Sequence, residues 1–248
     1  MSRLLIIPAA GRGSRLRTDI PKPLVTVAGR TMLDRLADLY APFVDRVVVI
    51  ANPHSRAAVS EWARRRGASV EVQPAPTGML DAILLAGRAV GTERPASVWI
   101  TWADQVGVLP ATLERVAAAE RADPQPAMLV PTVQRRNPYI HFTRDPGGRI
   151  AGLLQQREGD AMPPEGEGDI GVFAMTRAAF ERDLPAFARE TTTGAGTGER
   201  NFVPFVPWLA QRRTVVTIPC TDPREAIGIN TAEDLQVVES WLVERDRG

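Results

Sequence analysis

The sequence predicts an α/β protein with a Rossmann-like, three-layer α/β/α sandwich, in which a mostly parallel mixed sheet lies between helices. In the first half, short apolar runs typical of strands alternate with segments whose apolar residues recur at the helical period. The runs are continuous rather than alternating, as expected of strands covered on both faces. Such folds bind ligands outside the carboxyl ends of their strands, so the loops there are where a site is expected.

The first half contains four strands, each followed by a helix. Leu4–Ile7 is an apolar run bounded by a loop rich in small and basic residues, and 45–51, DRVVVIA, is rich in β-branched residues. The segment 31–40 has apolar residues at helical spacing, namely Met32, Leu33, Leu36 and Leu39. The remaining strands are expected at 68–73 and 97–101, and the remaining helices at 55–66, 79–90 and 110–122.

The second half is less regular, and the sheet is expected to become mixed there. Asp145–Gly148, DPGG, predicts a hairpin or short loop between two strands, and the Gly/Thr-rich segment 190–201 predicts a mobile loop. Strands are expected at 127–133, 139–143, 149–155, 171–175 and 214–219, and helices at 177–187, 202–211 and 232–245. No repeat or linker separates independent units, so 1–248 is expected to form a single domain.

Composition narrows the classes of function. Thirty basic and twenty-nine acidic residues give a net charge of +1, which provides no global field for nucleic acid or an anionic membrane. The single Cys220 fits a reducing compartment, and the sequence has no Cys/His spacing typical of zinc. No apolar stretch reaches the length of a membrane span, and no signal region is evident. We therefore expect a cytoplasmic protein with no nucleic-acid or membrane partner.

The loop after the first strand is suited to a polyphosphate. Its small residues let backbone N–H groups approach an anion closely. These residues, with the proline that precedes them, are Pro8, Ala9, Ala10, Gly11, Gly13 and Ser14. Arg12, Arg15, Arg17 and Lys22 add charge-assisted hydrogen bonds. The loop matches neither the Walker pattern nor the dinucleotide pattern, because Gly11-Arg12-Gly13 continues as Ser-Arg-Leu. It predicts a site for a nucleoside triphosphate.

The two halves of this loop carry a family resemblance. Residues 11–16, GRGSRL, and 21–24, PKPL, resemble the signature of nucleotidyltransferases that act on sugar phosphates: Gly-x-Gly-Ser/Thr-Arg-Leu/Met, a spacer, then Pro-Lys-x-Leu. The resemblance extends over nearly the whole chain. It implies a glycosyltransferase-A-type fold, with a nucleotide-binding half at 1–125 and an acceptor-binding half at 126–248. It also implies transfer of NMP from an NTP to a phosphorylated acceptor, a sugar 1-phosphate being favoured, with Arg15 and Lys22 as catalytic residues.

The resemblance further implies a magnesium site. Asp104 follows the fourth strand in WITWADQ, where the family has a Mg²⁺-binding aspartate, although Ala103 replaces the usual preceding glycine. The segment 225–231, EAIGINT, matches the family's Gly-Val/Ile-Asn motif and makes Asn230 the second ligand. Thr231 is then the N-cap of the last helix. Two oxygen ligands, completed by water and phosphate, suit Mg²⁺.

The segment 73–82, QPAPTGMLDA, resembles the one that reads the base in uridylyl- and thymidylyltransferases. Gln73 would use its amide on a pyrimidine edge, and Gly78 would let the backbone approach the base. This favours UTP or dTTP. A flipped amide could read cytosine as well, so CTP stays open.

The acceptor side departs from the family. Asn137–Phe142, NPYIHF, stands where hexosamine-phosphate enzymes have Gly-Tyr-Gly-Arg, and their sugar-binding Glu and Asn are also changed. The candidate acceptor contacts are Gln155, Arg157 and Asp169, with Glu199 or Arg200 reaching in from the 190–201 loop. These changes leave open a cytidylyltransferase that activates a phosphonate or a non-sugar phosphate.

Two further alternatives belong to other classes. A nucleotide-binding sensor without turnover is disfavoured by the intact Arg15, Lys22, Asp104 and Asn230. A glycosyltransferase of related fold would carry Asp-x-Asp, but Trp102 takes the place of the first acid. The oligomeric state stays open, a homodimer included.

Overall fold

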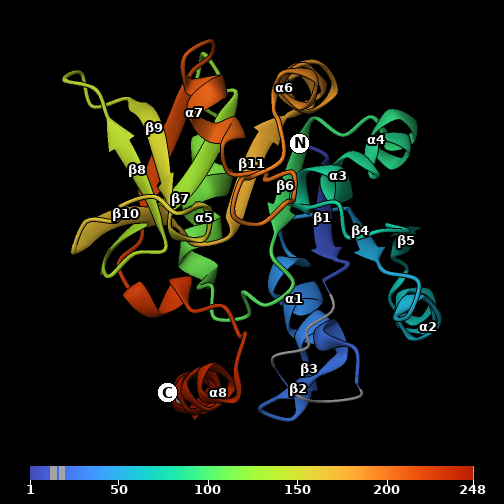
Figure 1. The fold of residues 1–248 in the computed structure, drawn as a ribbon. Helices are drawn as coiled ribbons and strands as arrows, with labels where there is room; N and C mark the ends of the chain where they lie inside the picture. Colours follow the sequence, from blue (N-terminus) through green and yellow to red (C-terminus); the bar gives the residue numbers. More distant parts are fainter. Residues whose placement is uncertain (12–15, 17–19, 248) are drawn as a thin grey trace.

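Residues 1–11, 16 and 20–247 are described by the structure, a computed structural model of the chain. Among them, eight strands form one sheet in the order β10-β7-β11-β6-β1-β4-β5, with β12 paired to β7 (Figure 1). The strands are β1 (Arg3–Ala9), β4 (Arg46–Ala51), β5 (Ser69–Val72), β6 (Ser97–Thr101), β7 (Met128–Arg136), β10 (Glu165–Asp169), β11 (Val172–Thr176) and β12 (Val215–Pro219).

The sheet is parallel in the first half of the chain and mixed in the second, as the sequence predicts. β1 pairs in parallel with β4 and β6, and β4 pairs in parallel with β5. β11 runs antiparallel to β6 and β7, and β12 returns parallel to β7. The predicted α/β class and the mixed sheet are confirmed.

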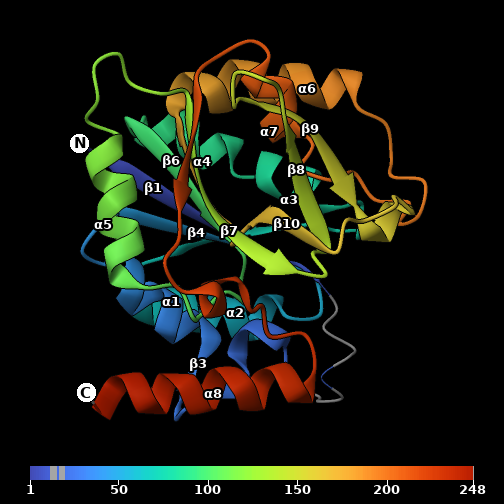
Figure 2. The same cartoon turned by 90° about the vertical axis from the view of Figure 1, so that its left-hand side faces the viewer.

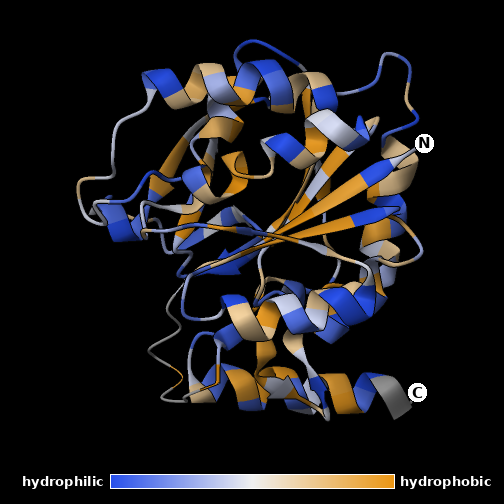
Figure 3. Cartoon of the chain, turned by 90° about the vertical axis from the view of Figure 1, so that its right-hand side faces the viewer, coloured by the Kyte–Doolittle hydropathy of each residue, from blue (hydrophilic) through white to orange (hydrophobic). Residues whose placement is uncertain are grey.

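Helices cover both faces of the sheet, and alternate residues of β1 show the two layers. Leu5 and Ile7 belong to a core under α1 (Met32–Tyr40), α2 (Arg56–Arg66), α5 (Pro110–Ala119) and α8 (Ala232–Arg247). Leu4 and Ile6 belong to a second core under α3 (Met79–Leu84), α4 (Gly87–Glu93), α6 (Leu184–Glu190) and α7 (Phe205–Ala210). Figure 2 shows the sheet between these layers, with α8 outermost. In Figure 3 the strands are mostly hydrophobic, while the helices alternate between hydrophobic and hydrophilic residues.

Smaller elements complete the fold. β2 (Thr26–Val27) and β3 (Arg30–Thr31) form a hairpin after the predicted phosphate-binding loop, residues 8–17, which is called the phosphate loop below. β8 (Ile140–Arg144) and β9 (Ile150–Gln155) pair antiparallel across 145–148, which confirms the predicted hairpin. Short helical turns lie at η2 (Lys22–Leu24), η3 (Gln156–Glu158) and η5 (Pro223–Ala226). In the part of the chain that is described, no helix is long and apolar enough to cross a membrane.

Three predicted helices differ from those observed. The helix expected at 79–90 is two helices. At the end of α3 the Leu85 N–H divides its hydrogen bond between the Asp81 and Ala82 carbonyls, so the regular α-helical bonding is interrupted there. The helix expected at 177–187 contains a π-helical segment, Ala179–Asp183, just before Pro185, which lacks the N–H that a regular α-helix would use. The helix expected at 202–211 begins only at Phe205, after Pro204.

The sequence analysis missed β10, whose residues read EGEGD. It carries no apolar or β-branched residue, so no strand pattern is visible. Its two glycines allow β8 to pass close by. A Cβ at Gly166 would lie 2.6 Å from His141 Nδ1, and one at Gly168 would lie 2.9 Å from the Ile140 carbonyl oxygen. Tertiary packing rather than local propensity therefore selects this strand.

Candidate active site

Lys22 joins the two predicted metal ligands at the carboxyl edge of the sheet. Its Nζ lies 2.6 Å from Asp104 Oδ2 and 3.0 Å from Asn230 Oδ1. Lys22 opens η2 after the phosphate loop, Asp104 follows β6, and Asn230 lies two residues before the start of α8. The Lys22 and Asp104 side chains are 16% and 18% exposed, so the pair is shielded but reachable. Residues from three distant parts of the sequence thus meet at one point.

Local hydrogen bonds fix the orientation of Asn230. Its Nδ2 donates to the Gly228 carbonyl (3.2 Å), which directs Oδ1 toward Lys22. Its backbone N–H and that of Thr231 both donate to Asp234 Oδ2, and Asp234 N donates to Thr231 Oγ1. Thr231 therefore caps α8, as predicted.

The loop that carries Asn230 is also tied to the loop that carries Asp104. Ile229 N donates to the Asp104 carbonyl at 3.1 Å. A Cβ at Gly228 would lie only 3.4 Å from the Asp104 carboxylate and 3.2 Å from Gln105 Nε2. The glycine of the EAIGINT motif allows this close approach.

The donor set fits Mg²⁺. Asp104 Oδ2 and Asn230 Oδ1 converge on one cationic atom, the Lys22 Nζ. Mg²⁺ is commonly held by one or two protein oxygens, its other positions being filled by water and phosphate. Among the described residues there is no group of three or more His, Cys, Asp or Glu that could hold a metal. A cation bound here would compete with Lys22 for both oxygens.

A small pocket of about 90 Å³ lies beside the beginning of the phosphate loop. It is lined by Pro8, Ala10, Gly11, Gln73, Pro76, Gly78, Met79, Ala82 and Glu199. Five of these are predicted nucleotide-binding residues, while Ala9 is buried at the end of β1. The predicted Gly13, Ser14 and Arg15 lie outside the described residues. The structure thus joins the phosphate loop to the predicted base-reading segment.

Gln73 is held inside the chain. Its Nε2 donates to the Gly78 carbonyl (2.9 Å) and to Thr77 Oγ1 (3.3 Å), and the residue is only 6% exposed. Its amide nitrogen therefore shapes the 73–78 turn in this structure. Reading a base with that nitrogen would require the turn to give up these bonds.

Comparisons with known proteins identify relatives of this chain. The MobA-like NTP transferase domain matches residues 5–165. The chain belongs to this family. It is also 26% identical over 245 residues to the bifunctional protein GlmU of Pseudomonas putida strain GB-1, covering 96% of this chain and 51% of that protein. It is 31% identical over 193 residues to the bifunctional protein GlmU of Mycobacterium bovis strain ATCC BAA-935, covering 73% of this chain and 38% of that protein. The chain thus spans about half the length, or less, of these curated relatives.

The acceptor candidates of this NTP transferase do not all lie together. Asp169 ends β10, is 5% exposed and accepts a hydrogen bond from Gly171 N (2.8 Å). Its burial raises the pKa of its carboxyl group to about 6. Gln155 ends β9 and Arg157 is exposed in η3. Glu199, in contrast, lines the pocket of Gln73 and Gly78, on the nucleotide side.

The sequence analysis missed two residues at this edge. Asn52 follows β4, and its Nδ2 donates to the carbonyls of Ala10 (3.1 Å) and Gly11 (3.4 Å). These two bonds fix the backbone at the beginning of the phosphate loop. A polar residue directly after a buried parallel strand was the available signal. Tyr139 was passed over within NPYIHF. The residue is 39% exposed, and its ring lies 5.1 Å from the Arg135 guanidinium. Partial desolvation of its hydroxyl group, followed by the charge of Asp169, raises the pKa of that hydroxyl.

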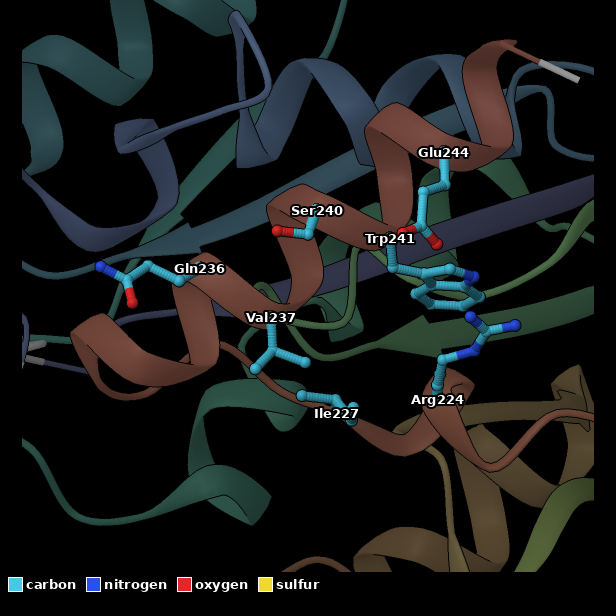
Figure 4. A pocket seen from close by; sticks show the side chains of 7 residues that line it. All are labelled: Arg224, Ile227, Gln236, Val237, Ser240, Trp241 and Glu244. Carbon is cyan, nitrogen blue, oxygen red and sulfur yellow. The ribbon is translucent and has the colours of Figure 1, made fainter.

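A second pocket, of about 400 Å³, lies between η5 and α8 (Figure 4). Its lining residues are Arg224, Ile227, Gln236, Val237, Ser240, Trp241 and Glu244. The Arg224 guanidinium lies 4.9 Å from the centre of the Trp241 ring, and no predicted site residue lines the hollow. This larger pocket is therefore separate from the residues that carry the predicted chemistry, which lie beside the smaller pocket.

Proposed function

We propose that this member of the NTP transferase family transfers NMP from a nucleoside triphosphate to a phosphorylated acceptor, with Mg²⁺ as cofactor and pyrophosphate as the other product. The meeting of Lys22, Asp104 and Asn230 beside the phosphate loop is the observation that carries this proposal. A phosphate loop, a cation and two oxygen ligands at one sheet edge suit phosphoryl chemistry better than acyl or hydride transfer.

The chain's own residues have clear tasks in this reaction. The backbone of Pro8–Gly11 and the residues after it would hold the triphosphate, and Lys22 would neutralise charge on the phosphates. An acceptor phosphate oxygen attacks the α-phosphorus in line, and the bond to the β-phosphate breaks to release pyrophosphate. The attacking phosphate is already ionised, so no general base is required. Mg²⁺, held by Asp104 and Asn230, would stabilise charge on the reacting phosphates. Arg15 would assist Lys22.

The substrates follow from the residues around the pocket. Gln73 and Gly78 support a pyrimidine nucleotide, UTP or dTTP, because an amide can pair with the pyrimidine edge where the backbone approaches closely. Gln155, Arg157 and Asp169 are proposed to contact the acceptor, a sugar 1-phosphate, and Glu199 to contact it from the nucleotide side. Because NPYIHF replaces the Gly-Tyr-Gly-Arg stretch of hexosamine-phosphate enzymes, a second candidate function is a cytidylyltransferase that acts on a phosphonate or a non-sugar phosphate.

The chain is proposed to act as one domain. The family match ends at residue 165, yet β11 and β12 lie in the same sheet as β1, and Asn230 contacts Lys22. Residues after the matched region therefore contribute to the same site.

The test is pyrophosphate release with Mg²⁺, crossing UTP, dTTP, CTP, ATP and GTP with sugar 1-phosphates, phosphocholine and simple phosphonates. Activity with UTP or dTTP and a sugar 1-phosphate is the expected result. Activity only with CTP and a non-sugar acceptor would favour the second candidate. If no pair of substrates gives pyrophosphate release, and the protein also binds none of the NTPs, the proposed function is contradicted.

A further inference from the structure

Glu158 anchors a loop that reaches the nucleotide pocket. This loop, residues 194–201, is called the strap below. Glu158 Oε1 accepts hydrogen bonds from Thr197 Oγ1 (2.6 Å) and Asn201 Nδ2 (2.7 Å), and Oε2 accepts from Gly196 N (2.8 Å) and Thr197 N (3.4 Å). Both carboxylate oxygens are thus engaged by the strap. These bonds, that of the Thr197 hydroxyl above all, lower the pKa of Glu158, so the ionised form holds the strap.

At two of its glycines the strap lies too close to η3 for any side chain. A Cβ at Gly194 would overlap the Glu158 carboxylate, and one at Gly196 would overlap the Arg157 carbonyl oxygen. Gly194 N also donates to the Glu199 carbonyl (2.8 Å), which closes the strap on itself. The Gly/Thr composition that predicts a mobile loop therefore serves close docking in this structure.

The other end of the strap is bonded to the base-reading segment. Arg200 N donates to the Thr77 carbonyl (2.8 Å), and Leu80 N donates to the Arg200 carbonyl (3.0 Å). Gly78 lies between these bonds with a φ of +123°, and a Cβ there would overlap the Arg200 backbone. The Arg200 guanidinium also pairs with Asp81 on α3. The Thr77–Leu80 segment is therefore held by Gln73 from one side and by the strap from the other.

From these contacts we infer that Glu158 is a positioning residue: through the strap it holds Glu199 and the Thr77–Leu80 backbone in the nucleotide pocket. Glu158 lies next to Arg157, a proposed acceptor contact, so the strap connects the acceptor side of the site with the nucleotide side. This inference rests on the proposed function. Glu158 touches no reacting atom in this account and acts only through the strap.

The test replaces Glu158 by Ala and, from the strap side, Thr197 by Val, which removes the hydroxyl at similar volume. Glu158→Ala is expected to raise KM for the NTP and for the acceptor on the order of tenfold, with a smaller effect on kcat, since binding surfaces are loosened while Lys22 and Asp104 are untouched. Thr197→Val is expected to shift both KM values in the same direction, and Thr197→Ser to restore them. Glu165→Ala, which removes an exposed carboxylate of neighbouring β10, is the matched control and is expected to leave both unchanged.

Limited trypsin digestion reads strap docking without any activity. Cleavage after Arg200 is expected to be about tenfold faster in Glu158→Ala than in Glu165→Ala, because the bond becomes accessible when the strap opens. The affinity for UTP with Mg²⁺, measured by calorimetry, is expected to fall in parallel. Wild-type KM values and UTP affinity in Glu158→Ala would overturn the inference while leaving the proposed function intact. A wild-type protein that neither binds NTP nor releases pyrophosphate would instead mark the failure of the proposed function.

Discussion

Lys22 occupies the point on which the Asp104 and Asn230 oxygens converge, so an ammonium and a divalent cation cannot hold both oxygens at once. Binding of Mg²⁺ requires Lys22 to turn away, and a triphosphate gives the lysine a new anionic partner. The same residue can thus keep the site neutral when empty and contact phosphate when filled.

Replacing Lys22 by Met is therefore expected to have opposite effects on metal affinity and on turnover. Without nucleotide, Mn²⁺ as a stand-in for Mg²⁺ should bind on the order of tenfold more tightly, because a competing unit charge is gone. Turnover should fall by about two to three orders of magnitude, since phosphate charge is no longer neutralised. Electron paramagnetic resonance of free Mn²⁺ and pyrophosphate release measure the two effects. Lys22→Arg keeps the charge, and its metal affinity should stay near that of the wild type. Weaker Mn²⁺ binding in Lys22→Met would contradict the competition.

Asp169 gives a pH-dependent prediction. Burial raises the pKa of its carboxyl group from 3.8 to about 6, so the folded chain holds this proton more tightly than the unfolded chain. The contribution of Asp169 to the free energy of unfolding therefore falls as pH rises from about 4 to about 6, and stays low above that. Asn cannot titrate. We therefore compare the free energy of unfolding of Asp169→Asn with that of the wild type at each pH. Relative to the wild type, the variant should be about 2 kcal/mol more stable at pH 7 than at pH 4. Urea unfolding at both pH values measures it, and an unchanged difference would contradict the shift.

At the scale of elements, α8 packs outside the sheet and follows Asn230 in the chain. It begins at Ala232, two residues after Asn230, and its Trp241 is 6% exposed and packs so closely on Gly107 that a Cβ there would overlap the ring. The Arg224 guanidinium of η5 also lies against the ring, 4.9 Å from its centre (Figure 4). Packing of the helix therefore sets where the asparagine stands.

Trp241→Ala is expected to lower the free energy of unfolding by about 3 kcal/mol or more, because the ring leaves a cavity between η5, α8 and Gly107. Val237→Ala on the same helix is the matched control. Val237 is 52% exposed, so a change within about 0.5 kcal/mol is expected. Chemical denaturation measures both. Equal stability of the two variants would show that α8 does not pack as described.

Elements with a strong local pattern could be predicted from the sequence, and elements selected by packing could not. The run RVVVIA of β4 and the spacing of Met32, Leu33 and Leu36 in α1 are local signals, and both elements form as expected. β10 has none, since EGEGD becomes a strand only because its glycines lie under β8. The meeting of Lys22, Asp104 and Asn230 could be expected because family motifs name all three. The place of Glu199 on the nucleotide side could not, because it depends on where the strap docks.

At the scale of the whole molecule, the residues proposed to act in the reaction lie at one edge of the sheet. The ends of β1, β4 and β6 supply the phosphate loop, Asn52 and Asp104, and the later strands and α8 bring Asp169 and Asn230 to the same edge. The proposed nucleotide contacts thus come from the first half of the chain, and the proposed acceptor contacts from the second. The NTP transferase family match, over residues 5–165, covers the first half and extends to the beginning of β10, so that Asp169 and Asn230 lie beyond it.

The central claim is that the molecule moves a nucleotidyl group at this edge. The most direct measurement supplies NTP labelled at the α-phosphorus, with Mg²⁺ and the acceptor panel, and follows the label and pyrophosphate together in the wild type and in Asp104→Ala. The account predicts that the label joins the acceptor in equal amount to the pyrophosphate released, and that Asp104→Ala loses both while keeping its fold by circular dichroism. Label that stays in the NTP, or transfer that survives in Asp104→Ala or in EDTA, would contradict it.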